Sequence, residues 1–191
     1  GWERGEGVRG GVGGREIKIA FTQGHGELEP IYLADITQSL EEFYTVEGLN
    51  INLTDTACSK QFIAQISAAP DKAGEILLNG VMNQMNTYQA LIIAKPRISF
   101  LDEELFLLDQ YVMNGGKLIW LAEPLIAEMD SVAKYGSIMT ADYNLNVNDL
   151  LFRYGVRINP SLIQDLNCHG IPVLAKGVSG QPGFLPWLFY P

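Results

Sequence analysis

Residues 90–124 read ALIIAKPRISFLDEELFLLDQYVMNGGKLIWLAEP, and this stretch decides the fold. Residues 90–94 form a short, unbroken apolar run, which is typical of a strand that is buried on both faces. Pro96 ends this run, because proline has no N–H group for the hydrogen-bond ladder. Residues 117–122 form a second run of the same kind, which ends before Pro124. Two fully buried strands that are joined by a helix predict a parallel pair with a right-handed crossover.

The residues between the two runs have the pattern of that helix. Ser99 stands three residues before Asp102, as a capping residue does, and the acidic residues 102–104 place negative charge at the positive end of the helix dipole. Gly115 and Gly116 supply the left-handed conformation that ends a helix. The apolar residues at helical spacing, which form the expected buried face, are Leu101, Leu105, Leu108 and Val112.

A second unit of this kind precedes the first. Residues 16–22 alternate apolar and polar side chains as a strand does, residues 30–44 keep helical spacing, and residues 46–53 read as another strand. The two units together predict an α/β fold with a three-layer, open, mainly parallel sheet.

The remaining elements have weaker patterns. They are a short helix over residues 60–66, a loose helical rhythm over 70–86, irregular chain with a helical turn over 125–143, a short helix capped by Asn146 and ended by Gly155, and a short strand over 156–158.

The composition favours a soluble, globular chain. Its 191 residues are 47% hydrophobic, which is enough for a sizeable core. The formal net charge of −9 argues against nucleic acid as a partner and disfavours direct docking onto an anionic membrane surface.

The two ends of the chain differ in character from its middle. Residues 1–15 are rich in glycine and are expected to form a flexible linker, while residues 16–191 are expected to form a single α/β domain. No apolar run approaches the ~20 residues that cross a bilayer. Because the chain has no initiator Met and ends just after an aromatic run, we expect it to be the excised soluble portion of a longer protein.

The turn after the first strand, QGHGE, is the most suggestive candidate site. Ligands of open α/β sheets lie beyond the carboxyl ends of the strands, and Glu123 is at the corresponding end of a later strand. There is no third glycine, so the turn does not match the dinucleotide-binding fingerprint. The turn is either a ligand-binding site or a tight strand-to-helix turn that His25 caps. The candidate ligand-binding residues are Gln23, Gly24, His25, Gly26, Glu27 and Glu123.

Other chemistry has little support in the sequence. Neither Cys58 nor Cys168 lies on the sharp strand–helix elbow that a nucleophile needs, and we predict no catalytic residue. The two histidines, 25 and 169, and the scattered carboxylates have no metal-ligand spacing, so we predict neither a metal nor a cofactor. The two cysteines either pair with each other or are ordinary buried thiols.

The chain closes on FLPWLFYP, residues 184–191. Its prolines exclude it from a central strand, so it is expected to run extended over the surface or along an edge. Its large aromatic residues either cover the core or anchor a partner, and the candidate partner-binding residues are Phe184, Trp187 and Tyr190.

Four blocks of the sequence occur in an order that resembles a known family. They are IAFTQGHGELEP, the ALIIAKP to LIWLAEP unit, NDLLFRYGVRINPSLIQD and FLPWLFYP. Together they resemble the extracytoplasmic domain of the gliding-motility-associated ABC transporter auxiliary proteins of the GldG type, within the wider family of uncharacterised ABC-type transport components. Residues 16–191 are covered, and residues 70–86 do not match the family pattern.

This resemblance implies a location and partners. Such proteins are anchored in the inner membrane by helices outside this segment, carry this domain on the periplasmic side, and work with an ABC permease and ATPase. Other envelope proteins are further candidate partners. In Bacteroidota they are linked to gliding motility or export. The implied sheet resembles those of flavodoxin and class I glutamine amidotransferases, and a related domain of an intraflagellar transport subunit serves assembly.

Three hypotheses about function follow. The first is a non-enzymatic interaction domain of an ABC transporter complex. The alternative is a small-molecule or glycan receptor whose polar contacts are made by the QGHGE turn and Glu123. Hydrolase or amidotransferase-like chemistry rests on fold analogy alone.

Overall fold

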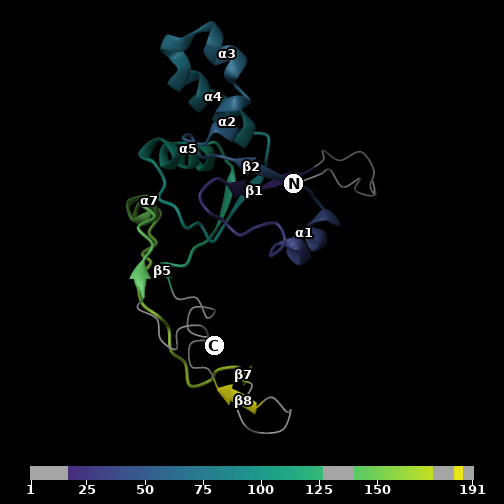
Figure 1. Ribbon diagram of the computed structural model, residues 1–191, viewed down its shortest axis with the longest axis vertical. Helices are drawn as coiled ribbons and strands as arrows, with labels where there is room; N and C mark the ends of the chain where they lie inside the picture. The colour runs from purple at the N-terminus through teal and green to yellow at the C-terminus, as the bar shows by residue number, and fades with distance from the viewer. Residues whose placement is uncertain (1–16, 127–139, 174–182, 187–191) are drawn as a thin grey trace.

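A computed structural model describes residues 17–126, 140–173 and 183–186 of the chain (Figure 1). Its centre is a four-stranded sheet with the strand order β2-β1-β3-β4. All three neighbouring pairs are parallel, so the predicted parallel α/β sheet is confirmed. The strands are β1 (Lys18–Gln23), β2 (Thr45–Asn50), β3 (Ala90–Ala94) and β4 (Lys117–Leu121).

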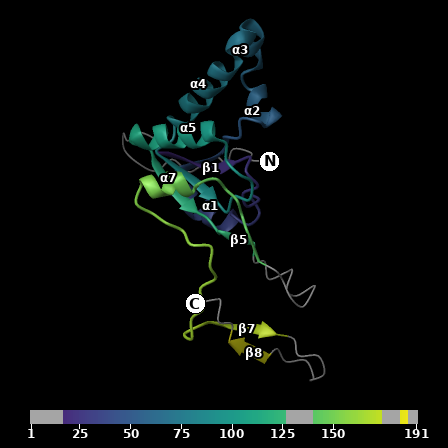
Figure 2. The same cartoon turned by 90° about the vertical axis from the view of Figure 1, so that its left-hand side faces the viewer.

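Helices lie on both faces of this sheet, which gives a three-layer arrangement (Figures 1 and 2). The helix α1 (Ala34–Glu41) lies on one side. The other side carries α2 (Thr56–Lys60), α4 (Ala73–Met85), α5 (Asp102–Met113) and α7 (Asn148–Arg153). Beyond α2, the chain forms α3 (Ile63–Ala68) and the 3-10 turn η1 (Pro70–Lys72). The helical rhythm predicted over residues 70–86 is confirmed by η1 and α4, whereas the single short helix predicted over 60–66 is replaced by α2 and α3.

The alternation of side chains along the strands divides the core into two clusters. Leu91 and Ile93 of β3 point toward α4 and α5, whereas Ile92 and Ala94 point toward α1. These four side chains are at most 7% exposed, which fits the prediction of a strand that is buried on both faces.

The helix α5 begins where it was expected but faces the core differently. Its buried residues are Glu104, Leu107, Leu108 and Tyr111, while Leu101 is 41% exposed. The prediction that Ser99 caps this helix is wrong, because the residue at the cap position is Leu101. The backbone N–H of Leu101 donates to the Glu104 carboxylate, which satisfies one of the free donors at the helix start.

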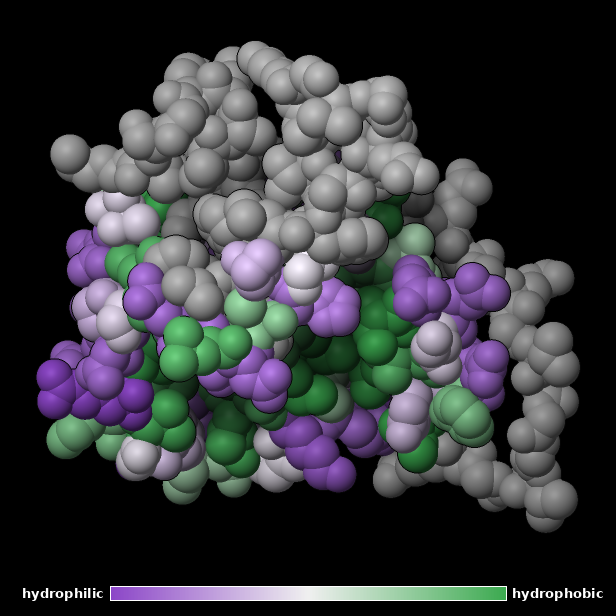
Figure 3. Space-filling model, turned by 90° about the horizontal axis from the view of Figure 1, so that it is seen from below, coloured by the Kyte–Doolittle hydropathy of each residue, from purple (hydrophilic) through white to green (hydrophobic). Residues whose placement is uncertain are grey.

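The strand β4 is not buried on both faces, which corrects the sequence prediction. Leu118 and Trp120 pack on the α5 side, but Ile119 and Leu121, on the opposite face, are 47% and 56% exposed. The physical reason is that α1 contributes to a cluster with β1, β2 and β3 that does not extend to β4. In the view from below, apolar residues gather around a hollow near the middle of the picture (Figure 3).

The chain after β4 also departs from the expectations. The two-residue strands β5 (Leu125–Ile126) and β6 (Ala141–Asp142) pair antiparallel where irregular chain was predicted, and residues 127–139 lie outside the described residues. Asn146 does not cap α7, because its side-chain amide donates instead to the carbonyl of Phe100 and to Asp102.

The helix α7 ends at Arg153, and Gly155, two residues later, has a φ of 78°, the left-handed conformation of the predicted stop. Residues 156–158 form no strand and instead continue as irregular chain.

The last described elements form a separate hairpin of β7 (Gly170–Val173) and β8 (Gly183–Pro186), which stands away from the sheet in both views (Figures 1 and 2). Phe184 is in β8, outside the central sheet as expected, while Trp187, Tyr190 and residues 1–15 lie outside the described residues. Within the described ranges, no helix is both long enough and apolar enough to cross a membrane.

Candidate functional site at the turn after β1

The QGHGE turn joins the end of β1 to the segment before α1. The backbone conformation of this turn requires glycine at two positions. Gly24 and Gly26 have φ angles of 110° and 69°, which L side chains rarely adopt. A Cβ on Gly24 would also lie 2.5 Å from the Cβ of Asn52, so the backbone here approaches the chain after β2 closely. These glycines serve the tight turn and its packing.

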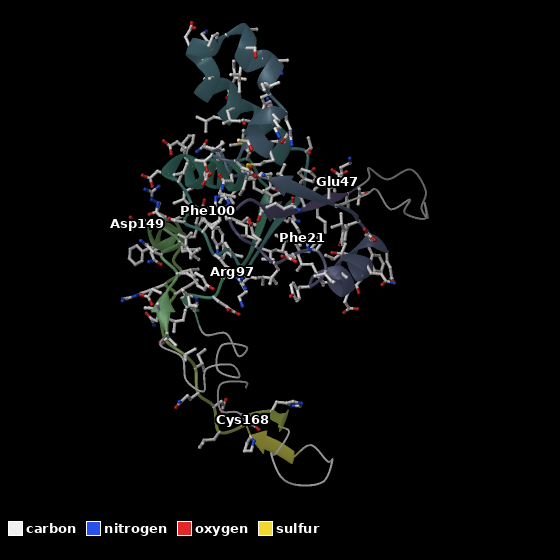
Figure 4. The ribbon with its side chains drawn as sticks, viewed as in Figure 1. Phe21, Glu47, Arg97, Phe100, Asp149 and Cys168 are labelled. Atoms are coloured by element: carbon white, nitrogen blue, oxygen red, sulfur yellow. The ribbon has the colours of Figure 1, made fainter. Side chains whose placement is uncertain are left out.

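The imidazole of His25 points into the protein. Its side chain is 1% exposed and stacks on the ring of Phe100, with the ring centroids 3.9 Å apart. Its Nε2 lies 2.9 Å from Oε2 of Glu104. Phe100 lies between α5 and the sheet, so this stack joins the turn to the start of that helix (Figure 4).

Glu104 is the centre of this buried cluster. Its Oε1 accepts the backbone N–H of Leu53 at 2.8 Å, and its Oε2 accepts the backbone N–H of Leu101 at 2.7 Å. Burial raises the pKa of this carboxyl. The hydrogen bonds from His25, Leu101 and Leu53 together lower the pKa by more than burial raises it, so the pKa lies below its usual value. Glu104 therefore stays ionised and binds the turn, the chain after β2 and α5 together.

Glu27 completes the cluster from the other side of the imidazole. One of its carboxylate oxygens accepts the backbone N–H of His25 at 2.6 Å, and the other accepts the hydroxyl of Thr22 at 3.1 Å. Its nearer oxygen is 3.9 Å from Nδ1 of His25, and this buried nitrogen has no hydrogen-bond partner among the described residues.

An open cavity of about 590 Å³ lies over the turn. Four members of the predicted ligand-binding set contribute to it, but the set is not assembled as a whole. His25 is turned away beneath the turn, and Glu123 pairs instead with Lys95, whose Nζ is 2.9 Å from its Oε2. The lining residues are Gln23, Gly24, Gly26, Glu27, Leu28, Glu29, Pro30 and Gly48.

Sequence reasoning missed Glu104, which it treated only as a charge near the helix dipole. The signal was its spacing, because Glu104 lies four residues before Leu108 and seven before Tyr111, on the face that α5 buries. An apolar stripe that contains one acidic residue marks a carboxylate with a buried partner.

The structure also places the two cysteines and the residues that could bind a metal ion. Cys58 is buried in α2 and Cys168 is partly exposed before β7, and both are free thiols. Within the described ranges, no group of three histidine, cysteine or acidic residues is placed to hold a metal ion.

Comparison with known proteins identifies the family to which this chain belongs. The model of one protein family, described as an ABC-type uncharacterized transport system, matches residues 16–191. The chain belongs to this family. The family is one of auxiliary components of ABC-type transport systems, which agrees with the sequence resemblance at this level.

No curated protein matches the chain. A solved structure titled "mmIFT52 N-terminal domain" is similar at 16% sequence identity with a TM-score of 0.49. The match covers 89% of this chain but only 64% of that one.

Proposed function

We propose that this domain is a non-catalytic docking module of an ABC transporter auxiliary protein, placed on the periplasmic side of the inner membrane. Membership of the transporter family supplies the context. The observation that carries the proposal is a set of large apolar side chains on the outer surface of α5 and α7. The partner is the permease part of a transporter that also contains an ATPase. The biological role of this transporter is gliding motility or export in Bacteroidota.

The docking surface is built from two helices that a hydrogen bond joins. Phe106 and Met113 lie seven residues apart on α5, and both are well exposed, at 59% and 72%. Phe152, on α7, is 72% exposed, and the hydroxyl of Tyr154 donates to Asp109 of α5 at 2.7 Å. We call Phe106, Met113, Phe152 and Tyr154 the α5–α7 surface. Exposed aromatic and methionine side chains are enriched at protein interfaces.

The buried cluster supports this role, because it fixes where α5 stands. His25 and Glu104 join the turn after β1 to the first turn of α5, and Asn146 donates to the carbonyl of Phe100 just before that helix. The polar groups of the QGHGE turn thus position the helix that carries the α5–α7 surface.

The experiment is co-purification of the full-length, membrane-anchored protein in mild detergent. We expect Phe106→Ser combined with Phe152→Ser to lose most of the bound permease, because exposed apolar anchors contribute much of the binding energy. The matched control is Ile63→Ser on α3, which removes an equally exposed apolar side chain from a different surface. Circular dichroism checks that all variants fold, and recovery of the permease with the double variant at the native level contradicts the proposal.

The cavity over the QGHGE turn favours a second candidate function, a receptor for a small molecule or glycan. Its size is within the range of ligand pockets, and Gln23 and Glu27 contribute polar groups to its lining. A glycan and metabolite library screened by thermal shift tests this function, with Gln23→Ala as the variant that weakens a true ligand. A ligand that stabilises both proteins equally does not bind in this cavity.

A further inference from the structure

The strand β2 forms one edge of the central sheet, because the order β2-β1-β3-β4 gives it a hydrogen-bonded neighbour on one side only. The backbone N–H of Thr45 donates to the carbonyl of Ile17 on the β1 side. Alternate residues of a strand direct their backbone groups to opposite sides, so the N–H and C=O groups of Val46 and Gly48 point away from β1. No residue within the described ranges forms a hydrogen bond with these outward groups.

This edge lacks the usual protection against strand pairing. Proteins commonly protect an edge strand with proline or with an outward lysine, and β2, which reads TVEGLN, contains neither. Its one charged side chain, Glu47, is already engaged, because its carboxylate pairs with Lys18 and accepts the hydroxyl of Tyr88 at 2.7 Å. Gly48 lines the open cavity over the QGHGE turn, so the edge is accessible at this residue.

The surroundings of this edge are acidic. Residues 19–59 contain neither lysine nor arginine. Glu29 lines the same cavity as Gly48, and Glu41 and Glu42 stand shortly before β2 in the chain. These three carboxylates are exposed and form no ion pair with any residue of the described ranges. The edge therefore attracts a cationic segment and repels an acidic one, including a second copy of this chain with its net charge of −9.

Two exposed aromatic rings stand where β2 begins. Phe43 is 75% exposed and Tyr44 is 37% exposed, and their ring centroids lie 6.4 Å apart. The face of an aromatic ring attracts a lysine or arginine side chain, and an exposed ring also packs against the apolar stem of such a side chain. The rings and the carboxylates beside them thus favour the same class of ligand.

We infer that the outer edge of β2 binds an extended, basic segment of a partner protein, which adds to the sheet as a further strand. The backbone groups of Val46 and Gly48 supply the main-chain hydrogen bonds. Lysine or arginine side chains of the added strand pair with the unpaired carboxylates at both ends of the edge. This edge shares no residue with the α5–α7 surface, so it serves a second partner.

Amide hydrogen exchange tests the main-chain contact directly. The probe is an end-blocked octapeptide of alternating lysine and valine, which is added to the isotopically labelled chain. We expect the N–H groups of Val46 and Gly48 to exchange rapidly in the free chain and at least about tenfold more slowly with the peptide, because they gain hydrogen-bond partners. The N–H of Thr45, which bonds to β1, is slow in both states. Slow exchange at Val46 and Gly48 in the free chain would mean that the edge is already covered, and it would overturn the inference.

Two further peptides separate strand addition from simple attraction of charge. The first carries an N-methyl group on every residue, so it keeps the positive charge but has no N–H donor. The second has glutamate in place of lysine, so it keeps the backbone donors but has the opposite charge. We expect neither peptide to bind measurably. Binding of the N-methylated peptide with the affinity of the probe rules out main-chain pairing, and equal binding of the acidic peptide rules out a basic partner.

Paired charge variants locate the contact on the protein. We expect Glu41→Gln combined with Glu42→Gln to weaken binding of the lysine–valine peptide by at least about threefold, because each exposed ion pair contributes modestly. The matched control is Glu75→Gln combined with Glu103→Gln, which removes the same charge from exposed positions on α4 and α5. Circular dichroism checks that both double variants fold. Equal affinities of the two variants overturn the inference, because the peptide then responds to net charge and not to the edge of β2.

Discussion

Nε2 of His25 lies 2.9 Å from Oε2 of Glu104, and both side chains are 1% exposed although 79 positions separate them in the sequence. This contact joins the glycine-rich turn to the first turn of α5. It gives His25, a predicted ligand-binding residue, a place in the buried packing of the protein. The imidazole of the turn is therefore used inside the molecule, where it helps to position the helix that carries the proposed α5–α7 surface.

Removal of the Glu104 carboxylate is expected to destabilise the protein strongly. Glu104→Ala leaves the imidazole of His25 and the N–H groups of Leu53 and Leu101 without their buried acceptor, which costs about 3–5 kcal/mol. Glu104→Gln keeps one acceptor and should cost about 1–3 kcal/mol. Urea unfolding measures both. The neighbouring, exposed Glu103→Ala is the control, and an equal loss of stability in all three variants would show that burial of Glu104 is unimportant.

The same carboxylate predicts a loss of stability in acid. The pKa of Glu104 is lower in the folded protein than its ordinary value of 4.5, so the folded state binds this proton less tightly than the unfolded chain. Its contribution is therefore complete above about pH 4.5 and is lost as the pH falls through the lowered folded-state value. Unfolding free energies measured between pH 7 and pH 3 should fall less steeply for Glu104→Gln than for the native chain. Parallel curves would assign the acid sensitivity to other groups.

Two glycines of α4 should respond in opposite directions to the same change. A Cβ on Gly80 would lie 2.3 Å from the ring of Phe62, which is 8% exposed, and overpacking of this kind costs about 1–3 kcal/mol. A Cβ on Gly74 meets no atom within 4 Å, so alanine there should stabilise the helix by about 0.5–1 kcal/mol. Thermal unfolding of Gly80→Ala and Gly74→Ala tests this pair. If both variants gain stability, α3 and α4 do not pack as closely as the structure has them.

The two thiols should differ in reactivity. Burial raises the pKa of the Cys58 thiol, and the charges of Asp55 and Glu104 raise it further, so little nucleophilic thiolate is present at Cys58. Cys168 is partly exposed in the irregular chain before β7. A colorimetric thiol reagent should detect one fast group in the native protein and two in urea, and Cys168→Ser should remove the fast group. Two fast groups in native protein would place Cys58 at the surface.

Local patterns in the sequence were enough for the central unit. The apolar run of β3, the position of α5 and the stop at Gly115 all follow from periodicity and from the conformations that each residue allows. The predicted buried face of α5 was shifted by about one residue from the observed one. The reason is that Glu104 has the appearance of a surface charge in the sequence, where its buried partner cannot be seen. That partner, His25, lies 79 positions away in the sequence, so no local pattern indicates the contact.

The candidate site shows the same limit. The sequence placed His25 and Glu123 together at one end of the sheet, since both follow the carboxyl ends of parallel strands. In the structure Glu123 pairs with Lys95, and His25 points inward to Phe100. Strand order brings residues to the same edge, but the direction of a side chain depends on what it packs against.

By itself the sequence determined the alternation of strands and helices, because apolar spacing and glycine and proline positions act over a few residues. The tertiary structure alone decided which polar groups are buried together and which apolar strand stays uncovered. Those outcomes depend on the order β2-β1-β3-β4, which leaves β4 at an edge and brings the turn after β1 within reach of Glu104. Contacts between residues far apart in the chain form only when the sheet is assembled, and no local pattern encodes them.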